Sequence, residues 1–253
     1  MPFTQLSAGQ IEYERFAVPQ AKGPAVVMLH EGLGSVSMWK DFPARLARAL
    51  GRNVIAYSRL GYGRSERLHA PRNPRYMHEE ALIHLPQFLD RLEMESPILF
   101  GHSDGGSIAL IHAARSGRSV AGIVALAPHV MVEDISVSSI RAAKVAYETT
   151  NLREKLARHH DDVDGVFWGW NDIWLHSDFR SWNIEADLHR IACPILAIQG
   201  EQDEYGSMQQ IDRIASAAPN VELLRLDQCR HSPHRDQPDA VLSAMTSWTD
   251  RLW

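Results

Sequence analysis

The sequence predicts an α/β fold with a mainly parallel sheet flanked by helices and an inserted helical cap. Short apolar runs bounded by turn residues recur along the chain with helical patterns between them, and this alternation is typical of parallel sheets covered on both faces. The length of 253 residues suits one core domain with an insertion, since such sheets often run to ~200–250 residues. A hydrophobic share of 45% and a charged share of 23% are ordinary for a globular protein.

Six apolar segments are expected to form the buried strands. Each is short and ends near a turn signal. In chain order they are Ala25–His30, Asn53–Tyr57, Pro97–Gly101, Val120–Ala125, Pro194–Gln199 and Val221–Leu226. Ligands bind at the carboxyl ends of the strands in open α/β sheets, so candidate functional residues are sought there.

Two helices of the core are predicted from their periodicity. Leucines recur at helical spacing in the segment from Tyr76 to Leu92, where Pro86 should kink the helix or shift its boundary. An apolar stripe from Val241 to Leu252 predicts a final helix, and Pro238 supplies its start signal. This last helix is expected to cover one face of the sheet.

The strand-helix alternation breaks between His129 and Arg190. We therefore predict a helical cap at residues 129–190, inserted into an α/β core of residues 1–128 and 191–253. Four of the seven tryptophans lie here, namely Trp168, Trp170, Trp174 and Trp182. Two interpretations are open: the tryptophans at 168, 170 and 174 line an apolar substrate pocket, or the aromatic cluster forms the small core of the cap itself.

Composition and charge exclude several classes of function. A formal net charge of -5 gives no basis for binding nucleic acid, which relies on concentrated positive charge. The N-terminus lacks the pattern of a signal peptide, and no apolar run reaches the ~18–20 residues of a membrane span. Cys193 and Cys229 do not make a disulfide framework. We expect a cytoplasmic protein with a small-molecule substrate and no membrane partner; nothing in the sequence indicates its oligomeric state.

One cluster of potential metal ligands stands out. His159, His160, Asp161 and Asp162 are consecutive, and Asp164 follows. Adjacent ligands on a helix point in different directions, and the spacing matches no zinc or EF-hand pattern. We interpret the cluster as a solvated helix end, and expect neither a metal nor a cofactor.

The chemistry centres on Gly101–Gly105, a Gly-x-Ser-x-Gly motif between an apolar strand and an apolar helix at Ser107–Ala114. In this setting Ser103 would occupy a strained strand-to-helix turn with its hydroxyl projecting, and the small residues two before and two after it would avoid a clash. Ser103 is therefore the candidate nucleophile.

A serine nucleophile needs a histidine base, which in turn needs an orienting carboxylate. Asp203 follows the strand Pro194–Gln199, and His231 follows the strand Val221–Leu226. Both would lie at the same edge of the sheet as Ser103. The three residue types thus occur in the order serine, acid, histidine.

With these motifs the chain resembles the α/β-hydrolase superfamily over essentially its whole length. The resemblance rests on the Gly-His-Ser-Asp-Gly-Gly elbow, the Gly-x-x-Asp loop at 200–203 and the His-x-Pro arrangement that begins at His231. It implies Ser103 as nucleophile, His231 as general base and then acid, and Asp203 as orienting carboxylate.

The resemblance also indicates why His231 and Asp203, and not nearby residues of the same type, are the candidate base and acid. His234 lies three residues beyond His231, but the His-x-Pro spacing selects His231. Glu201 and Glu204 flank Asp203 and are interpreted as solvated loop charges. His102 is expected to point away from Ser103 and to pack under the turn.

The oxyanion formed by attack on a carbonyl needs two backbone donors. Asp104 would supply one N–H by its position. The resemblance implies that Gly32, in the loop after the strand ending at His30, supplies the other.

Two departures from the family pattern are visible. Glu31 replaces the usual glycine beside Gly32. It is either a site carboxylate, which would repel anionic substrates or bind a cationic group, or the partner of a nearby arginine such as Arg59. In the segment from Tyr57 to Ser65 the turn is kept, while the polar pair that usually braces it has changed.

Together these features predict an acyl transfer in which a small uncharged ester or lactone is hydrolysed through an acyl-enzyme on Ser103, as in a carboxylesterase or lactonase. The same triad also fits hydrolysis of a carbon–carbon bond or an amide, or cofactor-free lyase chemistry. A third interpretation is a ligand receptor that keeps the scaffold and has little turnover.

Overall fold

An eight-stranded sheet forms the centre of the protein in the computed structural model, which describes residues 1–253. The strand order is β1-β2-β4-β3-β5-β6-β7-β8; β3 to β8 run parallel to one another, and β1 and β2 are antiparallel. The predicted α/β class with a mainly parallel sheet is confirmed. The strands are β1 (Phe3–Leu6), β2 (Gly9–Phe16), β3 (Val26–Leu29), β4 (Val54–Tyr57), β5 (Ile98–His102), β6 (Gly122–Leu126), β7 (Ile195–Gly200) and β8 (Val221–Leu226).

The N-terminal hairpin of β1 and β2 was not predicted. All six expected strands are present with ends shifted by at most two residues, but β2 reads Gly-Gln-Ile-Glu-Tyr-Glu-Arg-Phe and has no apolar run. It pairs with β4 through its backbone, with Tyr13 opposite Tyr57, and much of it is partly exposed. A strand with a solvated face needs no continuous apolar sequence.

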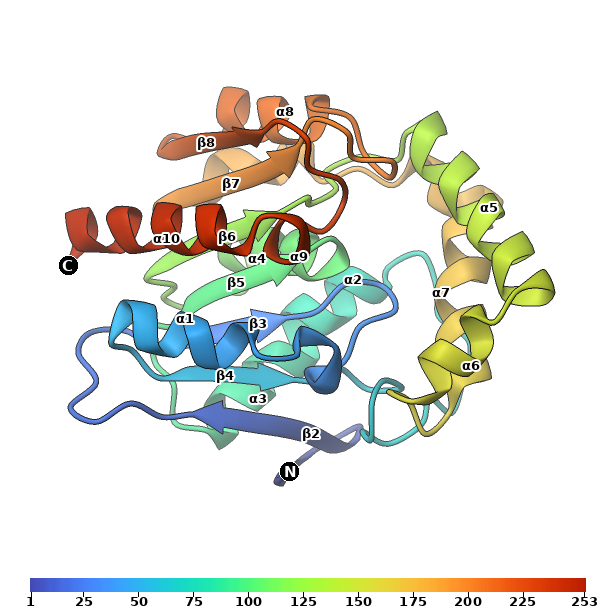
Figure 1. Ribbon diagram of the computed structural model, residues 1–253, viewed down its shortest axis with the longest axis horizontal. Helices are drawn as coiled ribbons and strands as arrows, with labels where there is room; N and C mark the ends of the chain where they lie inside the picture. The colour runs from blue at the N-terminus through green and yellow to red at the C-terminus, as the bar shows by residue number, and fades with distance from the viewer.

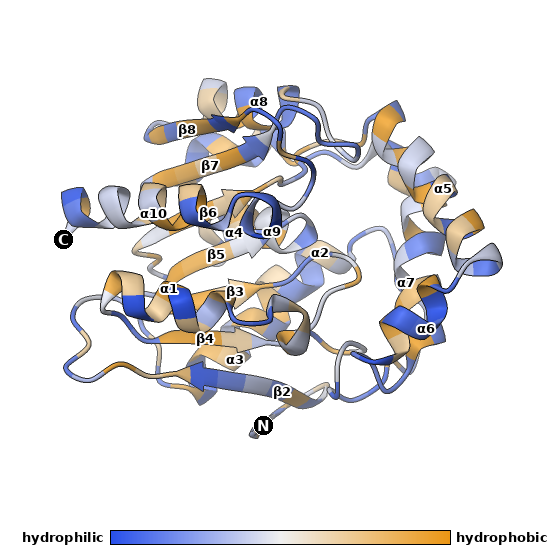
Figure 2. Ribbon diagram, viewed as in Figure 1, coloured by the Kyte–Doolittle hydropathy of each residue, from blue (hydrophilic) through white to orange (hydrophobic).

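Helices cover both faces of the sheet (Figure 1). On one face α1 and α10 pack with the strands in a cluster that includes Phe42, Leu46 and Trp248. On the other face lie α3, α4 and α8. Figure 2 shows the central strands largely in the colour of hydrophobic residues, as burial on both faces requires. The core helices are α1 (Phe42–Leu50), α2 (Tyr76–Glu79), α3 (Leu85–Arg91), α4 (Asp104–Arg115), α8 (Gln209–Ala217), α9 (Pro233–Asp236) and α10 (Pro238–Leu252).

Both predicted core helices are present. The segment from Tyr76 runs through α2, a π-helical turn η2 (Glu80–His84) and α3. The wide turn directly precedes Pro86, whose ring cannot donate the normal helical hydrogen bond. In α10, Val241 and Met245 are fully buried, and the ring of Trp248 lies where a side chain on Gly122 of β6 would otherwise be. This helix therefore covers one face of the sheet.

The segment between β6 and β7 is helical. It contains α5 (Asp134–Thr149), α6 (Leu152–Ala157), α7 (Val163–Leu175) and the 3-10 turns η3 (Ser177–Ser181) and η4 (Glu185–Arg190), and η1 (Val36–Trp39) is a further 3-10 turn after β3. Figure 1 shows α5, α6 and α7 beyond the carboxyl ends of the parallel strands. Leu188 of η4 belongs instead to the hydrophobic cluster beneath α4 and α8. No helix has the length and apolar character needed to cross a membrane.

Candidate active site

Ser103 occupies a strained turn between β5 and α4. Its backbone has φ of 53° and ψ of -119°, in the region that ordinary residues rarely adopt, and its N–H donates to Leu126 O at 2.9 Å. A side chain at Gly101 would collide with the backbone of Gly105, and one at Gly105 with the carbonyl of Leu29. The two glycines of the motif are thus required by close backbone contacts around Ser103.

His231 and Asp203 lie beside Ser103. The distance from Ser103 Oγ to His231 Nε2 is 3.0 Å, and His231 Nδ1 lies 2.9 and 3.0 Å from the two carboxylate oxygens of Asp203. Asp203 follows β7 and His231 follows β8, so the parallel sheet brings both to the edge where β5 ends. Burial alone would raise the pKa of Asp203, but attraction and hydrogen bonding from His231 outweigh it and the pKa is lowered.

The neighbouring residues occupy other positions. His234 is buried against Trp39 and Phe42 and has no hydrogen-bond partner, while Glu201 is exposed. Glu204 is different from the expected solvated charge, because its carboxylate accepts the backbone N–H of His231 at 3.2 Å. This contact depends on how the loops after β7 and β8 meet, which no local pattern in the sequence reveals.

Two backbone amides are available near Ser103. Asp104 is the first residue of α4, where an N–H has no partner within the helix. The N–H of Gly32 donates to no other group, and Gly32 lines the same cavity as Ser103. A side chain at Gly32 would collide with the indole of Trp170, so the helical segment packs directly on this loop.

Arg59 explains how the altered turn after β4 is braced. Its guanidinium is buried and donates to the carbonyl oxygens of His30 at 2.9 Å and Glu31 at 3.0 Å. It also lies 3.8 Å from the carboxylate of Asp104, whose other contact is the hydroxyl of Tyr76 at 2.7 Å. Arg59 therefore ties the loop that carries Gly32 to the start of α4.

The carboxylate of Glu31 pairs with residues other than Arg59. Its two oxygens lie 3.6 Å from His102 Nδ1 and 3.5 Å from Arg235, whereas Arg59 contacts only its backbone. Burial would raise the pKa of Glu31, but contacts with His102 and Arg235 prevail and hold it well below the usual range. The suggested partner Arg59 was wrong; Glu31 is both ion-paired and part of the cavity lining.

His102 packs under the elbow with its ring buried. Its Nε2 donates to the backbone carbonyl of His231 at 2.7 Å, since a carbonyl can only accept. One edge of the ring still contributes to the cavity wall.

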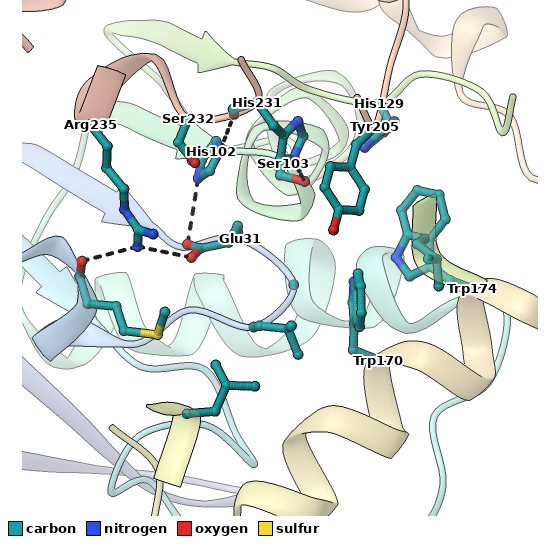
Figure 3. A pocket seen from close by; sticks show the side chains of 15 residues that line it. Glu31, His102, Ser103, His129, Trp170, Trp174, Tyr205, His231, Ser232 and Arg235 are labelled. Atoms are coloured by element: carbon teal, nitrogen blue, oxygen red, sulfur yellow. Dashed lines mark hydrogen bonds and ion pairs between the residues drawn. The ribbon is translucent and has the colours of Figure 1, made fainter. Parts of the chain in front are cut away.

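A cavity of about 180 Å³ opens beside Ser103. Figure 3 shows that the cavity has a polar side and an aromatic side. Glu31, His102, Ser232 and Arg235 lie on one side of Ser103, and an aromatic side lies opposite. The aromatic side contains His129, Trp170, Trp174 and Tyr205.

The predicted tryptophans divide between the cavity and the helical segment. Trp170 and Trp174 line the cavity, while Trp168 does not: it lies against Tyr147 and Phe167 and borders a different surface hollow. Positions 170 and 174 are one helical turn apart and share a face of α7, and position 168 does not. This difference in helical position could have been predicted from the spacing of the three tryptophans in the sequence. Trp170 and Trp174 thus line the cavity beside Ser103, and Trp168 packs among aromatic rings of the helical segment.

The segment from His159 to Asp164 is a solvated helix end only in part, since Asp161 is exposed and His160 is buried. His160 is 5% exposed; it accepts the N–H of Gly63 and donates to Leu33 O, both at 2.9 Å. Asp162 caps α7 by accepting the N–H of Gly165, and Asp164 lies in the first turn of that helix. The imidazole instead joins the helical segment to loops of the core. The structure places no three His, Cys, Asp or Glu side chains together in a way that could hold a metal ion.

Comparison with known proteins adds a family match. A family model described as "Alpha/beta hydrolase family" matches residues 26–244. Among curated proteins, a monoglyceride lipase of Rattus norvegicus is 21% identical, covering 98% of this chain and 89% of its own length. A proline iminopeptidase of Lactobacillus helveticus is 22% identical, with 99% and 97% covered.

Solved structures share the fold. An enol-lactonase from Burkholderia xenovorans superposes with a TM-score of 0.77 at 18% identity, covering 98% of this chain and 100% of its own. A proline iminopeptidase from Mycobacterium smegmatis gives a TM-score of 0.79 at 18% identity, with 99% and 98% covered. At these identities the structural likeness defines the fold alone.

Proposed function

The chain belongs to the alpha/beta hydrolase family, and from that premise we propose that it is a serine hydrolase that cleaves a small ester or lactone through an acyl-enzyme on Ser103. The observation that carries the proposal is the hydrogen-bonded line from Ser103 Oγ through His231 to Asp203, at 3.0 and 2.9 Å. This geometry is what a serine nucleophile with a general base requires.

In the proposed first step, Ser103 Oγ attacks the substrate carbonyl carbon while His231 Nε2 takes the hydroxyl proton. The carbonyl oxygen becomes an oxyanion that accepts the N–H groups of Gly32 and Asp104. The C–O bond to the alcohol then breaks, and the imidazolium of His231 gives its proton to the leaving oxygen. The alcohol is released, or stays attached in the case of a lactone, and the acyl group remains on Ser103.

In the second step, water attacks the acyl-enzyme and gives a proton to His231. The new oxyanion collapses, the acid product leaves, and the proton returns to Ser103 Oγ. Throughout, Asp203 keeps the proton of His231 Nδ1 on that nitrogen, so that Nε2 is free to accept. A lowered pKa of the Asp203 carboxyl supports this role, because the carboxylate must stay ionised.

The size of the cavity supports a small substrate. Its volume of about 180 Å³ is close to the ~150 Å³ of a protein cavity that binds benzene, and below the range of pockets for larger ligands. Uncharged substrates fit the aromatic side formed by Trp170 and Trp174. We also propose that residues 129–190 act as a cap that closes this cavity over Ser103.

Amide hydrolysis is the second candidate, since the chain is about as similar to a proline iminopeptidase as to a monoglyceride lipase. Parallel assays with ester, lactone, amide and diketone substrates of equal size separate this candidate, and carbon–carbon cleavage, from the main proposal. Faster turnover of an amide than of the matched ester would replace the ester assignment.

The direct test is the variant Ser103→Ala. We expect it to lose ester hydrolysis while keeping the wild-type circular dichroism and melting temperature. Full activity in the folded variant would refute the proposal, and a wild-type protein that binds esters without turnover would support a receptor. The expected cytoplasmic location stays a prediction, which subcellular fractionation would test.

A further inference from the structure

Three side chains on the aromatic side of the cavity carry polar groups that the protein does not use. We call His129, Trp174 and Tyr205 the donor wall; all three line the cavity. Trp174 Nε1 and His129 Nδ1 are buried and have no hydrogen-bond partner, and Trp174 as a whole is 2% exposed. In Figure 3 the hydroxyl of Tyr205 points into the cavity, between Ser103 and Trp170.

Buried polar atoms without partners cost free energy, so proteins rarely keep them unless another group supplies the hydrogen bond. The indole N–H of Trp174 is a donor only. Its natural complement is an oxygen acceptor, and a molecule bound in the cavity that Trp174 lines could supply one.

The donor wall is also uncharged. Burial, reinforced by the nearby His231, lowers the pKa of His129 to about 3, so this imidazole is neutral at physiological pH. Burial and the carboxylate of Glu204 raise the pKa of Tyr205, so the phenol keeps its proton. Three neutral polar groups suit a ketone, hydroxyl or ether oxygen, whereas a buried carboxylate would need a positive partner.

The wall adjoins the reacting groups. Ring centroids of Tyr205 and His231 are 4.7 Å apart, those of His129 and His231 are 6.0 Å apart, and the ring of Trp174 meets His129 edge-on at 4.9 Å. These three side chains therefore lie within reach of a substrate that would bind at Ser103.

We propose that the donor wall binds an uncharged oxygen acceptor of the substrate, separate from the scissile ester, with Trp174 Nε1–H as its main donor. This inference rests on the proposed ester or lactone hydrolysis and narrows its substrates to oxo-, hydroxy- or alkoxy-substituted esters. A site with unpaired buried donors discriminates against a substrate that lacks the acceptor, because the donors then stay unsatisfied.

Matched substrate pairs test the proposal. Methyl 4-oxopentanoate and methyl 4-methylidenepentanoate differ by a ketone oxygen in the acyl part, and 2-oxopropyl acetate and 2-methylidenepropyl acetate differ likewise in the alcohol part. We expect wild-type kcat/KM to favour the ketone by about 5- to 150-fold in at least one pair. Trp174→Phe keeps an aromatic ring without the N–H, and should bring that ratio close to one.

The control variant is Trp182→Phe, which also removes a buried indole N–H without a partner but at a residue that does not line the cavity. It should leave the ratio unchanged. Equal ratios in wild type and Trp174→Phe for both pairs, or an equal effect of Trp182→Phe, would overturn the inference.

A binding measurement separates this inference from the proposed chemistry. In Ser103→Ala protein labelled with ¹⁵N, saturation with the ketone ester should shift the indole N–H resonance of Trp174, and the methylidene ester should shift it less. An unmoved resonance at saturation would overturn the inference even if esters are hydrolysed. If wild type hydrolyses no ester, the proposed function fails, and this resonance alone decides whether the wall binds an acceptor.

Discussion

Replacing Asp203 by asparagine is the sharpest test of how the histidine is held. Both carboxylate oxygens face only donors. One accepts from Tyr205 N at 2.8 Å and Gly206 N at 3.2 Å, and the other from Gln199 Nε2 at 3.1 Å, while His231 Nδ1 lies near both.

In Asp203→Asn the side-chain NH₂ group can take the place of either carboxylate oxygen. We expect it at the oxygen that faces Gln199, because there it meets one N–H donor, whereas at the other oxygen it would meet two. There it meets His231 Nδ1 and donates to that nitrogen. This moves the imidazole proton to Nε2, and Nε2 can then no longer accept a proton from Ser103. We expect kcat to fall by ~10⁴-fold, the magnitude known for this change of tautomer in serine proteases.

The assay is hydrolysis of a short-chain nitrophenyl ester, with circular dichroism as the check on folding. Glu201→Gln is the matched control, because Glu201 lies on the same loop and is exposed; it should keep nearly wild-type kcat. A folded Asp203→Asn variant within about tenfold of wild type, or an equal loss in Glu201→Gln, would refute the proposed role of Asp203.

Three further predictions follow from the cavity and its loop. Nitrophenyl acetate and butyrate should be hydrolysed faster than the octanoate, because the cavity has a volume of only about 180 Å³. Trp170→Ala should enlarge the cavity and shift this preference toward the octanoate. An unchanged chain-length profile would contradict the position of Trp170 in the cavity. Gly32→Ala should lower kcat/KM by about 10-fold or more, since the methyl group meets the Trp170 indole and displaces a proposed oxyanion donor; full activity would refute that role. The pKa of Glu31 in the folded protein is held well below its ordinary value of 4.5. The stability that its carboxylate contributes is therefore fully present above the pKa of the unfolded chain, and it is lost as the pH falls toward the lower pKa of the folded protein. Urea unfolding should therefore show a stability difference between wild type and Glu31→Gln that shrinks from about pH 6 to pH 3, and a constant difference would contradict the ion pairs.

Patterns along the chain predicted those parts of the fold that depend on local sequence. Buried parallel strands read as short apolar runs, so the six strands from β3 to β8 were found within two residues. The glycines around Ser103 are required by contacts inside one turn, which makes the elbow readable as a motif. The hairpin of β1 and β2 lacked this signal because both strands are partly exposed, and a strand with a solvated face needs no continuous apolar run.

Features that depend on how separate segments meet were not predictable in this way. The contact between Glu204 and the His231 amide, and the pairing of Glu31 with Arg235, join loops more than 25 residues apart. His160 was predicted to be part of a solvated helix end, but it hydrogen-bonds to the loops at Leu33 and Gly63. The orientation of Trp168 could have been predicted from the helical phase of α7.

The central claim is that Ser103 is an activated nucleophile, and covalent labelling with a fluorophosphonate tests it most directly. Phosphonylation requires the serine hydroxyl to attack with help from a base, so mass mapping of the labelled wild-type protein should find one adduct, on the peptide that contains Ser103. Asp203→Asn should label much more slowly. A folded wild-type protein that takes up no label, or carries it on another residue, would contradict the account.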